Sequence, residues 1–119
     1  MRCHLMDTEQ FTSPDEVKFK LVENFVESDA YSLFLCQCET CDQLYLGCFL
    51  RISFLEEEDD CWNFWLPVND EDIELVRHNH DKGIELIQSR KRLVCNPVGE
   101  IYWNEGDEVA LIMGPGILF

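Results

Sequence analysis

The possible folds of this chain are restricted most by two long runs of strand-forming residues. A short turn that contains a cysteine separates the two runs. Residues 31–38 read YSLFLCQC and residues 44–55 read LYLGCFLRISFL, and both runs are rich in the apolar and aromatic residues that favour strands. Only residues 39–43 lie between them. This arrangement predicts an antiparallel hairpin. Gly47 is predicted to be a bulge or a point of close approach.

A third strand is predicted after an uninterrupted acidic run at residues 56–60. Five adjacent carboxylates repel one another and cannot pack in a core, so this run is expected to be an exposed loop. Residues 61–68 read CWNFWLPV. Because side chains alternate along a strand, Trp62 and Phe64 should share one face while Trp65 points to the other.

Two helices are predicted on either side of these strands. Ser13-Pro14-Asp15-Glu16 has the pattern of a capping box with proline at the first helical position, and apolar residues follow at helical spacing until about Ser28. Asn69 is a suitable N-cap for a second helix that extends towards the basic cluster at residues 90–92. Gly83 is expected to weaken that helix and to be the place where it splits.

The C-terminal part of the chain predicts three further strands, at residues 93–95, 101–103 and 109–113, separated by turns that contain glycine. The predicted order is therefore α-β-β-β-α-β-β-β. Such an order indicates an α+β fold with two helices and an antiparallel sheet. The length of 119 residues fits a single domain over residues 1–119.

The charge of the chain limits the classes of partner that it can be expected to bind. Aspartate and glutamate outnumber lysine and arginine by 24 to 9, which gives a net charge of −15. Nucleic acid and anionic membranes would repel such a chain, so direct binding to either is not expected. A basic protein would attract it. The chain has no long apolar run and no signal-like start, and we expect it to be cytoplasmic.

The sharpest local pattern is Cys36-x-Cys38-x-x-Cys41. A Cys-x-x-Cys turn between strands is typical of a zinc knuckle, in which a tight backbone loop directs two thiolates at one metal. Whether Cys36, Cys61 or Cys95 could complete such a site is left open by the spacing. A second Cys-x-x-Cys pair does not occur, so we expect no tightly bound zinc and no other cofactor.

No catalytic motif stands out, and we expect a binding protein rather than an enzyme. Acidic segments beside exposed aromatic residues make a suitable surface for a protein partner. The predicted partner-binding residues are Glu56, Glu57, Glu58, Asp59, Asp60, Trp65, Asp70, Glu71, Asp72, Glu105 and Asp107.

Residues 31–68 resemble a set of small bacterial proteins with a strand, a Cys-x-x-Cys turn, an aromatic strand, an acidic loop and a hydrophobic-proline segment. The corresponding pieces are YSLFLCQC, CETC, DQLYLG, LEEEDD and FWLPV, and CNPVGEIYWNEGDE resembles the closing hairpin of that set. Asp42 stands where a glycine usually follows the second cysteine. Some proteins of this kind look like immunity proteins, which bind and neutralise one cognate toxin, often a nuclease.

Together, the charge and the resemblance predict an immunity protein that neutralises a basic toxin domain, such as a nuclease, in a polymorphic or contact-dependent toxin system. The first alternative is an inhibitor from a phage or plasmid that mimics DNA with the same carboxylates. The second, from another class, is a zinc-knuckle adaptor protein built on Cys38 and Cys41. A toxin gene beside this one would favour the first hypothesis, and metal analysis would separate the second alternative.

Overall fold

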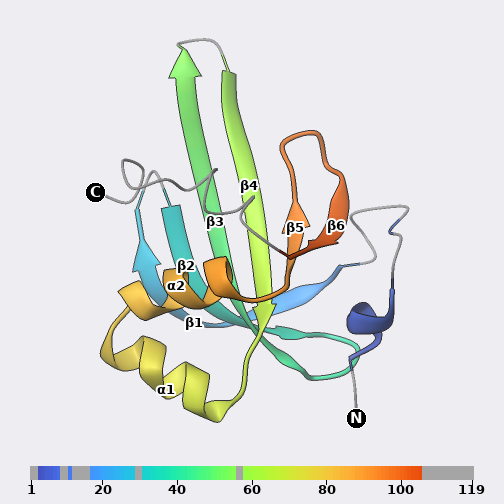
Figure 1. The fold of residues 1–119 in the computed structure, drawn as a ribbon, viewed down its shortest axis with the longest axis vertical. Coiled ribbons are helices and arrows are strands. Elements are labelled where there is room, and N and C mark those ends of the chain that lie inside the picture. The colour runs from blue at the N-terminus through green and yellow to red at the C-terminus, as the bar shows by residue number, and fades with distance from the viewer. Residues whose placement is uncertain (1–2, 9–10, 12–16, 29–30, 56–57, 106–119) are drawn as a thin grey trace.

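In a computed structural model, the strands of the chain form a six-stranded antiparallel sheet with the strand order β1-β2-β3-β4-β5-β6 (Figure 1). The structure describes residues 3–8, 11, 17–28, 31–55 and 58–105. Each strand pairs with the strand next to it in the chain, so the sheet is a meander. The elements in chain order are η1 (His4–Asp7), β1 (Phe19–Glu27), β2 (Tyr31–Cys38), β3 (Leu44–Leu55), β4 (Glu58–Pro67), α1 (Asp70–His78), α2 (Asp81–Ser89), β5 (Arg92–Cys95) and β6 (Ile101–Asn104).

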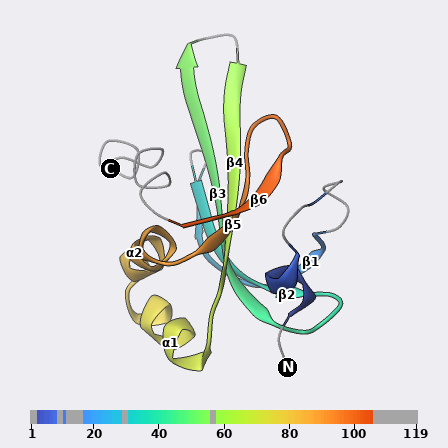
Figure 2. The ribbon, with the colours of Figure 1, turned by 45° about the vertical axis from the view of Figure 1, so that its right-hand side comes forward.

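The sheet is apolar on both faces, because the central strands alternate between two buried clusters. On β2, Leu33 and Leu35 belong to one cluster, while Cys36 and Cys38 belong to the other. A sheet that is apolar on both sides needs a layer over each side. The two helices form one layer and the N-terminal segment forms the other, as Figure 2 shows.

The helix layer packs through Ile73 and Val76 of α1 and Ile84 and Ile87 of α2, which lie in the cluster of Leu33 and Leu35. Helix α1 begins with a reciprocal capping box, in which the Asn69 side chain accepts a hydrogen bond from the Asp72 backbone and the Asp72 carboxylate accepts one from the Asn69 backbone. The predicted N-cap at Asn69 is confirmed.

The other layer consists of the N-terminal segment and lies on the opposite side of the sheet. Cys3 and Leu5 are buried there against Tyr45 of β3. Trp103 of β6 donates a hydrogen bond from its indole nitrogen to the backbone oxygen of Leu5 at 2.8 Å. Residues 3–5 are therefore part of the packed structure, although the sequence alone gave no reason to expect this.

The predicted element order is wrong, and the first helix is the main cause. The residues proposed to cap it, 13–16, lie outside the described residues, but residues 19–27 form strand β1. Two register shifts, between Leu21 and Glu23 and between Asn24 and Val26, interrupt the strand's pairing with β2. Because bulges break the two-residue alternation, the apolar spacing of this strand imitates a helix.

Two further predictions about local structure are corrected. The acidic run is not all loop, because β4 begins at Glu58, and the backbones of Asp59 and Asp60 pair with Ser53 and Ile52 of β3. The second helical region divides into α1 and α2 at residues 79–80 and not at Gly83, which lies inside α2.

The two glycines that were singled out are positions of close approach. A Cβ atom at Gly47 would overlap the ring of Phe34 on the neighbouring strand, and one at Gly83 would lie 2.8 Å from Leu33 Cδ2. Close approach at Gly47 was one of the two alternatives predicted. The predicted hairpin across residues 31–55 is confirmed. The predicted faces of the next strand are also confirmed, because Trp62 and Phe64 lie on one side of the sheet and Trp65 lies on the other. The predicted last strand at 109–113 lies outside the described residues.

Candidate functional site

Four potential metal ligands meet where the N-terminal segment crosses the β2–β3 turn. The thiols of Cys3, Cys38 and Cys41 and a ring nitrogen of His4 all lie within 4.8 Å of one another. We call these four residues the thiol–imidazole cluster. Cys3 and Cys38 are buried, Cys41 is half-buried and His4 is exposed, so the cluster sits at the edge of the core.

The β2–β3 turn places Cys38 and Cys41 side by side. The Asp42 amide donates to the Cys38 carbonyl at 3.0 Å, and the Cys38 amide donates to the Gln43 carbonyl at 2.9 Å. Asp42 has a left-handed backbone with φ of 61°, a conformation that glycine adopts freely and that aspartate tolerates better than most residues. The aspartate after the second cysteine therefore takes the backbone form expected of a glycine there.

The short helix η1 places Cys3 and His4. The Met6 amide donates to the Cys3 carbonyl at 3.0 Å, and the Thr8 hydroxyl donates to the His4 carbonyl at 3.0 Å. Leu5 is 1% exposed and fixes this turn on the sheet. Adjacent residues Cys3 and His4 thus direct their side chains at the same point as the cysteine turn.

The environment of the cluster perturbs its thiols in opposite directions. Burial raises the pKa of Cys3, and its hydrogen bond to Cys41 adds to the rise. Burial opposes ionisation of Cys41, but hydrogen bonds from Cys3, the Gln43 backbone, Cys38 and His4 outweigh it and lower the pKa of that thiol. Of these two thiols, Cys41 is therefore the one that ionises more readily.

Tyr45 lies beneath the cluster on β3. It is 0% exposed, and burial, followed by its interactions with Cys3, Cys38 and Cys41, raises the pKa of its hydroxyl. Although the hydroxyl lies near the Cys3 thiol, it makes no hydrogen bond of good geometry to any residue that the structure describes. A buried hydroxyl without a full partner is unusual in a folded protein.

The remaining cysteines do not join the cluster. Cys36 is buried beside Tyr45 and donates to the Tyr45 carbonyl at 3.5 Å, and burial raises the pKa of its thiol to about 12. Cys61 and Cys95 lie on β4 and β5, away from the turn. Sequence reasoning considered these three as partners for Cys38 and Cys41 and missed Cys3 and His4. The adjacent residues Cys3 and His4 are both possible metal ligands, but nothing in the sequence indicated that they lie beside the β2–β3 turn.

The predicted partner-binding residues are scattered over several elements. Asp70 and Glu71 are exposed in the first turn of α1, and Glu105 is exposed after β6. Asp72 is buried and bonded to Arg90, so its carboxylate is committed within the fold. Glu58, Asp59 and Asp60 are in β4, whereas Glu56, Glu57 and Asp107 lie outside the described residues.

Trp65, another predicted partner-binding residue, lies on β4. Its side chain is half-buried and packs against Phe19 of β1, with ring centroids 5.3 Å apart. It belongs to the cluster under the N-terminal segment. Trp65 therefore takes part in packing and keeps part of its side chain exposed.

The cations of the helix layer are paired with carboxylates of the same chain. Arg77 contacts Glu23 at 2.9 Å and Glu74 at 2.6 Å. Lys82 contacts Glu85 at 3.1 Å, and Arg90 contacts Asp72 at 2.8 Å. By contrast, Asp70, Glu71 and Asp81 make no ion pair with another described residue and leave this layer with an excess of negative charge.

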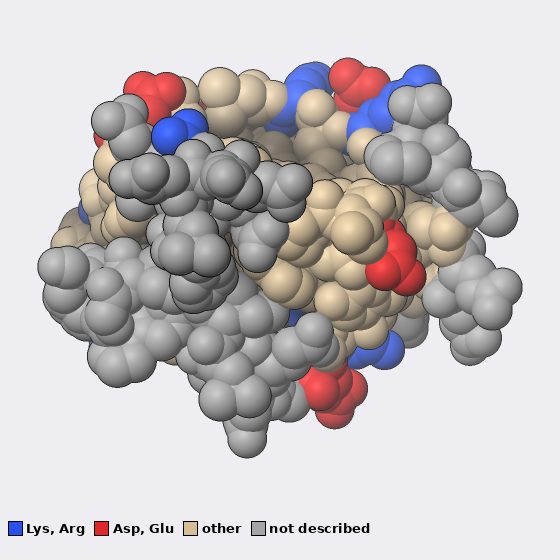
Figure 3. Space-filling model, turned by 90° about the horizontal axis from the view of Figure 1, so that it is seen from above, with Lys and Arg blue, Asp and Glu red and all other residues tan. Residues whose placement is uncertain are grey.

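The acidic excess is not visible from every side. Figure 3, which looks down on the molecule from above, shows acidic and basic side chains interspersed around a largely uncharged surface among the residues drawn in colour. Among the described residues, the two helices carry more acidic than basic side chains.

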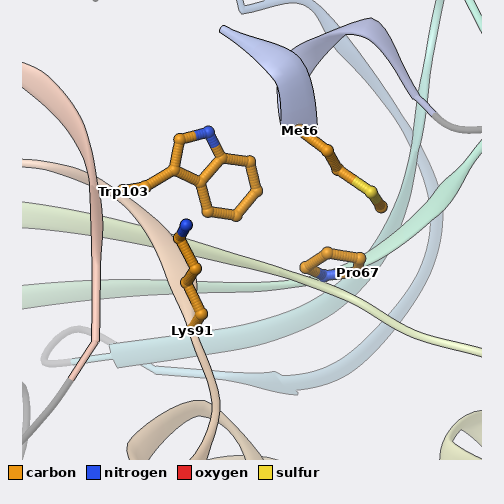
Figure 4. Close-up of a pocket in the computed structure, with 4 residues that line it drawn as sticks. All are labelled: Met6, Pro67, Lys91 and Trp103. Atoms are coloured by element: carbon orange, nitrogen blue, oxygen red, sulfur yellow. The ribbon is translucent and has the colours of Figure 1, made fainter. Parts of the chain in front are cut away.

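A small cavity of about 150 Å³ lies beside η1, lined by Met6, Pro67, Lys91 and Trp103 (Figure 4). The Lys91 ammonium lies 6.0 Å from the centre of the Trp103 ring, at the outer limit of a cation–π contact. Ligand pockets are usually about 300–1,000 Å³, so this cavity is small for one.

No protein-family model, curated protein or solved structure matches this chain. None of the described helices has the length and apolar character needed to cross a membrane.

Proposed function

We propose that this protein is a non-catalytic binding protein that recognises a basic protein partner through its acidic surface. The observation that carries the proposal is the charge of the helix layer. Its three cations, Arg77, Lys82 and Arg90, are paired with carboxylates of the chain itself. The exposed carboxylates Asp70, Glu71 and Asp81 are left to face a partner.

The net charge of −15 also supports a basic partner. Complementary charges steer two proteins together and raise the association rate far above the roughly 10⁵–10⁶ M⁻¹s⁻¹ of neutral pairs. In its finer form, the proposal is an immunity-type inhibitor of a basic toxin such as a nuclease, and that form rests on the resemblance of residues 31–68.

The test begins with capture of partners from an extract of the native host at low salt, followed by binding of the purified partner in stopped flow. Two triple variants are compared with the wild type. Asp70→Asn/Glu71→Gln/Asp81→Asn neutralises the helix layer. Glu27→Gln/Glu39→Gln/Glu100→Gln removes the same amount of charge from exposed sites on other elements.

We expect a basic partner whose association slows at high salt, and slows more with the helix-layer variant than with the matched control. An association rate indifferent to salt, or equal in both variants, contradicts the proposal. Rescue of cells that express the captured partner supports the immunity-type form. If the chain instead competes with DNA for a partner without toxicity, it is a DNA mimic.

A further inference from the structure

We propose that Cys3, His4, Cys38 and Cys41 bind one zinc ion, which fastens the N-terminal segment to the β2–β3 turn. This inference does not depend on the proposed partner, since the cluster and the helix layer lie on opposite sides of the sheet. It replaces the expectation of no bound zinc, which rested on the lack of a second Cys-x-x-Cys pair.

The donor set and its dimensions fit zinc. Three thiolates and one imidazole form one of the common structural zinc sites, and soft thiolate ligands select zinc over magnesium or calcium. Bonds of about 2.3 Å to sulfur and about 2.0–2.1 Å to nitrogen place tetrahedral ligand atoms about 3.5–3.8 Å apart. The four atoms here already lie within 4.8 Å, so only small side-chain movements are needed.

The backbone holds the ligands in place without the ion. The β2–β3 turn is closed by hydrogen bonds between Cys38 and residues 42–43, and η1 is fixed by the hydrogen bond from Trp103 to Leu5. Four protein ligands leave no open coordination position, which is typical of structural zinc rather than catalytic zinc. The site would therefore stabilise the layer under the sheet.

The Tyr45 hydroxyl gives a second, independent indication. It is buried near Cys3 and lacks a well-formed hydrogen bond within the described structure. A zinc-bound thiolate is a better acceptor than a neutral thiol, and zinc ligands commonly receive hydrogen bonds from neighbouring groups. Zinc at Cys3 would thus give this hydroxyl a thiolate acceptor, which it lacks in good geometry among the residues that the structure describes.

The experiment measures zinc in the full chain purified without chelator, by elemental analysis, and then the zinc affinity by competition with a chelating dye. The variants are His4→Gln and Cys41→Ser, which each remove one ligand, and Tyr45→Phe, which removes the neighbouring hydroxyl. Their matched controls are His78→Gln, an exposed histidine on α1, and Cys61→Ser, a half-buried cysteine outside the cluster. Circular dichroism shows whether each variant is folded.

We expect one zinc per chain in the wild type and both controls. His4→Gln should remain folded, since His4 is exposed, and should lower zinc affinity by at least the roughly 10–100-fold typical of a lost outer partner. Tyr45→Phe should lower it by about 10-fold. No zinc in the folded wild type, another metal in its place, or full affinity in folded His4→Gln would overturn the proposal.

Discussion

At the scale of single residues, the left-handed turn at Asp42 decides how Cys38 and Cys41 face each other. Its φ of 61° is open to glycine at no cost, is tolerated by aspartate and is costly for a residue with a plain Cβ. The aspartate at this position therefore preserves the turn that a glycine would form.

We predict that Asp42→Ala destabilises the protein by about 1 kcal/mol, whereas Asp42→Gly leaves stability unchanged or raises it. Chemical denaturation at saturating zinc measures both variants. Since both remove the same carboxylate, charge cannot explain a difference between them. Equal stabilities for the two variants would mean that the turn is not left-handed.

Other residues show what the sequence could not reveal about the site. The Cys-x-x-Cys turn was visible as a pattern, because both of its ligands lie within one hairpin. Cys3 and His4 reach it only through packing of Leu5 under the sheet and the contact with Trp103 near the other end of the described chain. Such tertiary contacts leave no spacing signal in the sequence.

At the scale of elements, the β2–β3 hairpin depends on the cross-strand pair of Phe34 and Gly47. The Phe34 ring lies over the glycine, where any Cβ would overlap it. Gly47→Ala should therefore cost about 1–3 kcal/mol, the usual range for overpacking.

A double-mutant cycle with Phe34→Leu checks this interpretation. If the ring causes the clash, Gly47→Ala should cost less in the Phe34→Leu background, with a coupling of at least about 0.5 kcal/mol. Additive costs in denaturation experiments would show that the ring does not limit this position.

The contact between α1 and the end of α2 predicts a pH dependence. Arg90 hydrogen bonds to Asp72 and, despite some opposing burial, lowers the pKa of that carboxyl below its usual 3.8. Because the folded pKa is lower than the unfolded one, this pair stabilises the fold fully above about pH 5. The contribution is lost as the pH falls through the lowered pKa.

Asp72→Asn should remove this part of the acid sensitivity. Between about pH 5 and pH 3, the stability of the variant should fall less steeply than that of the wild type. Urea denaturation at several pH values measures both slopes, and Glu85→Gln, which removes an exposed ion pair, is the matched control. Parallel slopes for Asp72→Asn and the wild type would contradict the assignment.

Some helices and strands could be predicted from the sequence, and others could not. The hairpin at 31–55 and the cap at Asn69 follow from local patterns, and both are present. The sequence of strand β1 predicts a helix because the register shifts of the strand hide the two-residue alternation, and only pairing with β2 reveals the strand. In β1, the local sequence pattern favours a helix while pairing with β2 requires a strand, and the pairing determines the structure.

At the scale of the whole molecule, the net charge of −15 opposes the folded state. Like charges repel more strongly in the compact form, and salt screens that repulsion. Raising ionic strength from about 0.01 M to about 1 M shortens the Debye length from about 30 Å to about 3 Å.

We therefore predict that added sodium chloride raises the thermal midpoint, measured at neutral pH with zinc saturating. The ion pairs of the helix layer would weaken under the same conditions, but exposed pairs contribute little each. A midpoint that falls with salt would show that local pairs outweigh the global repulsion.

The whole fold consists of a meander sheet covered by helices on one side and by the N-terminal segment on the other (Figure 2). The helix layer carries the proposed binding charge, and the thiol–imidazole cluster, which is the proposed zinc site, lies in the opposite layer. The central structural claim is that this cluster is a zinc site with three sulfur ligands and one nitrogen ligand.

X-ray absorption at the zinc edge of the full chain tests that claim most directly. We expect three sulfur atoms at about 2.3 Å and one nitrogen at about 2.0–2.1 Å around each zinc. In His4→Gln, the sulfur shell should remain while the imidazole signal disappears. A zinc ion surrounded only by nitrogen and oxygen, or an unchanged imidazole signal in His4→Gln, would show that zinc does not bind at the thiol–imidazole cluster.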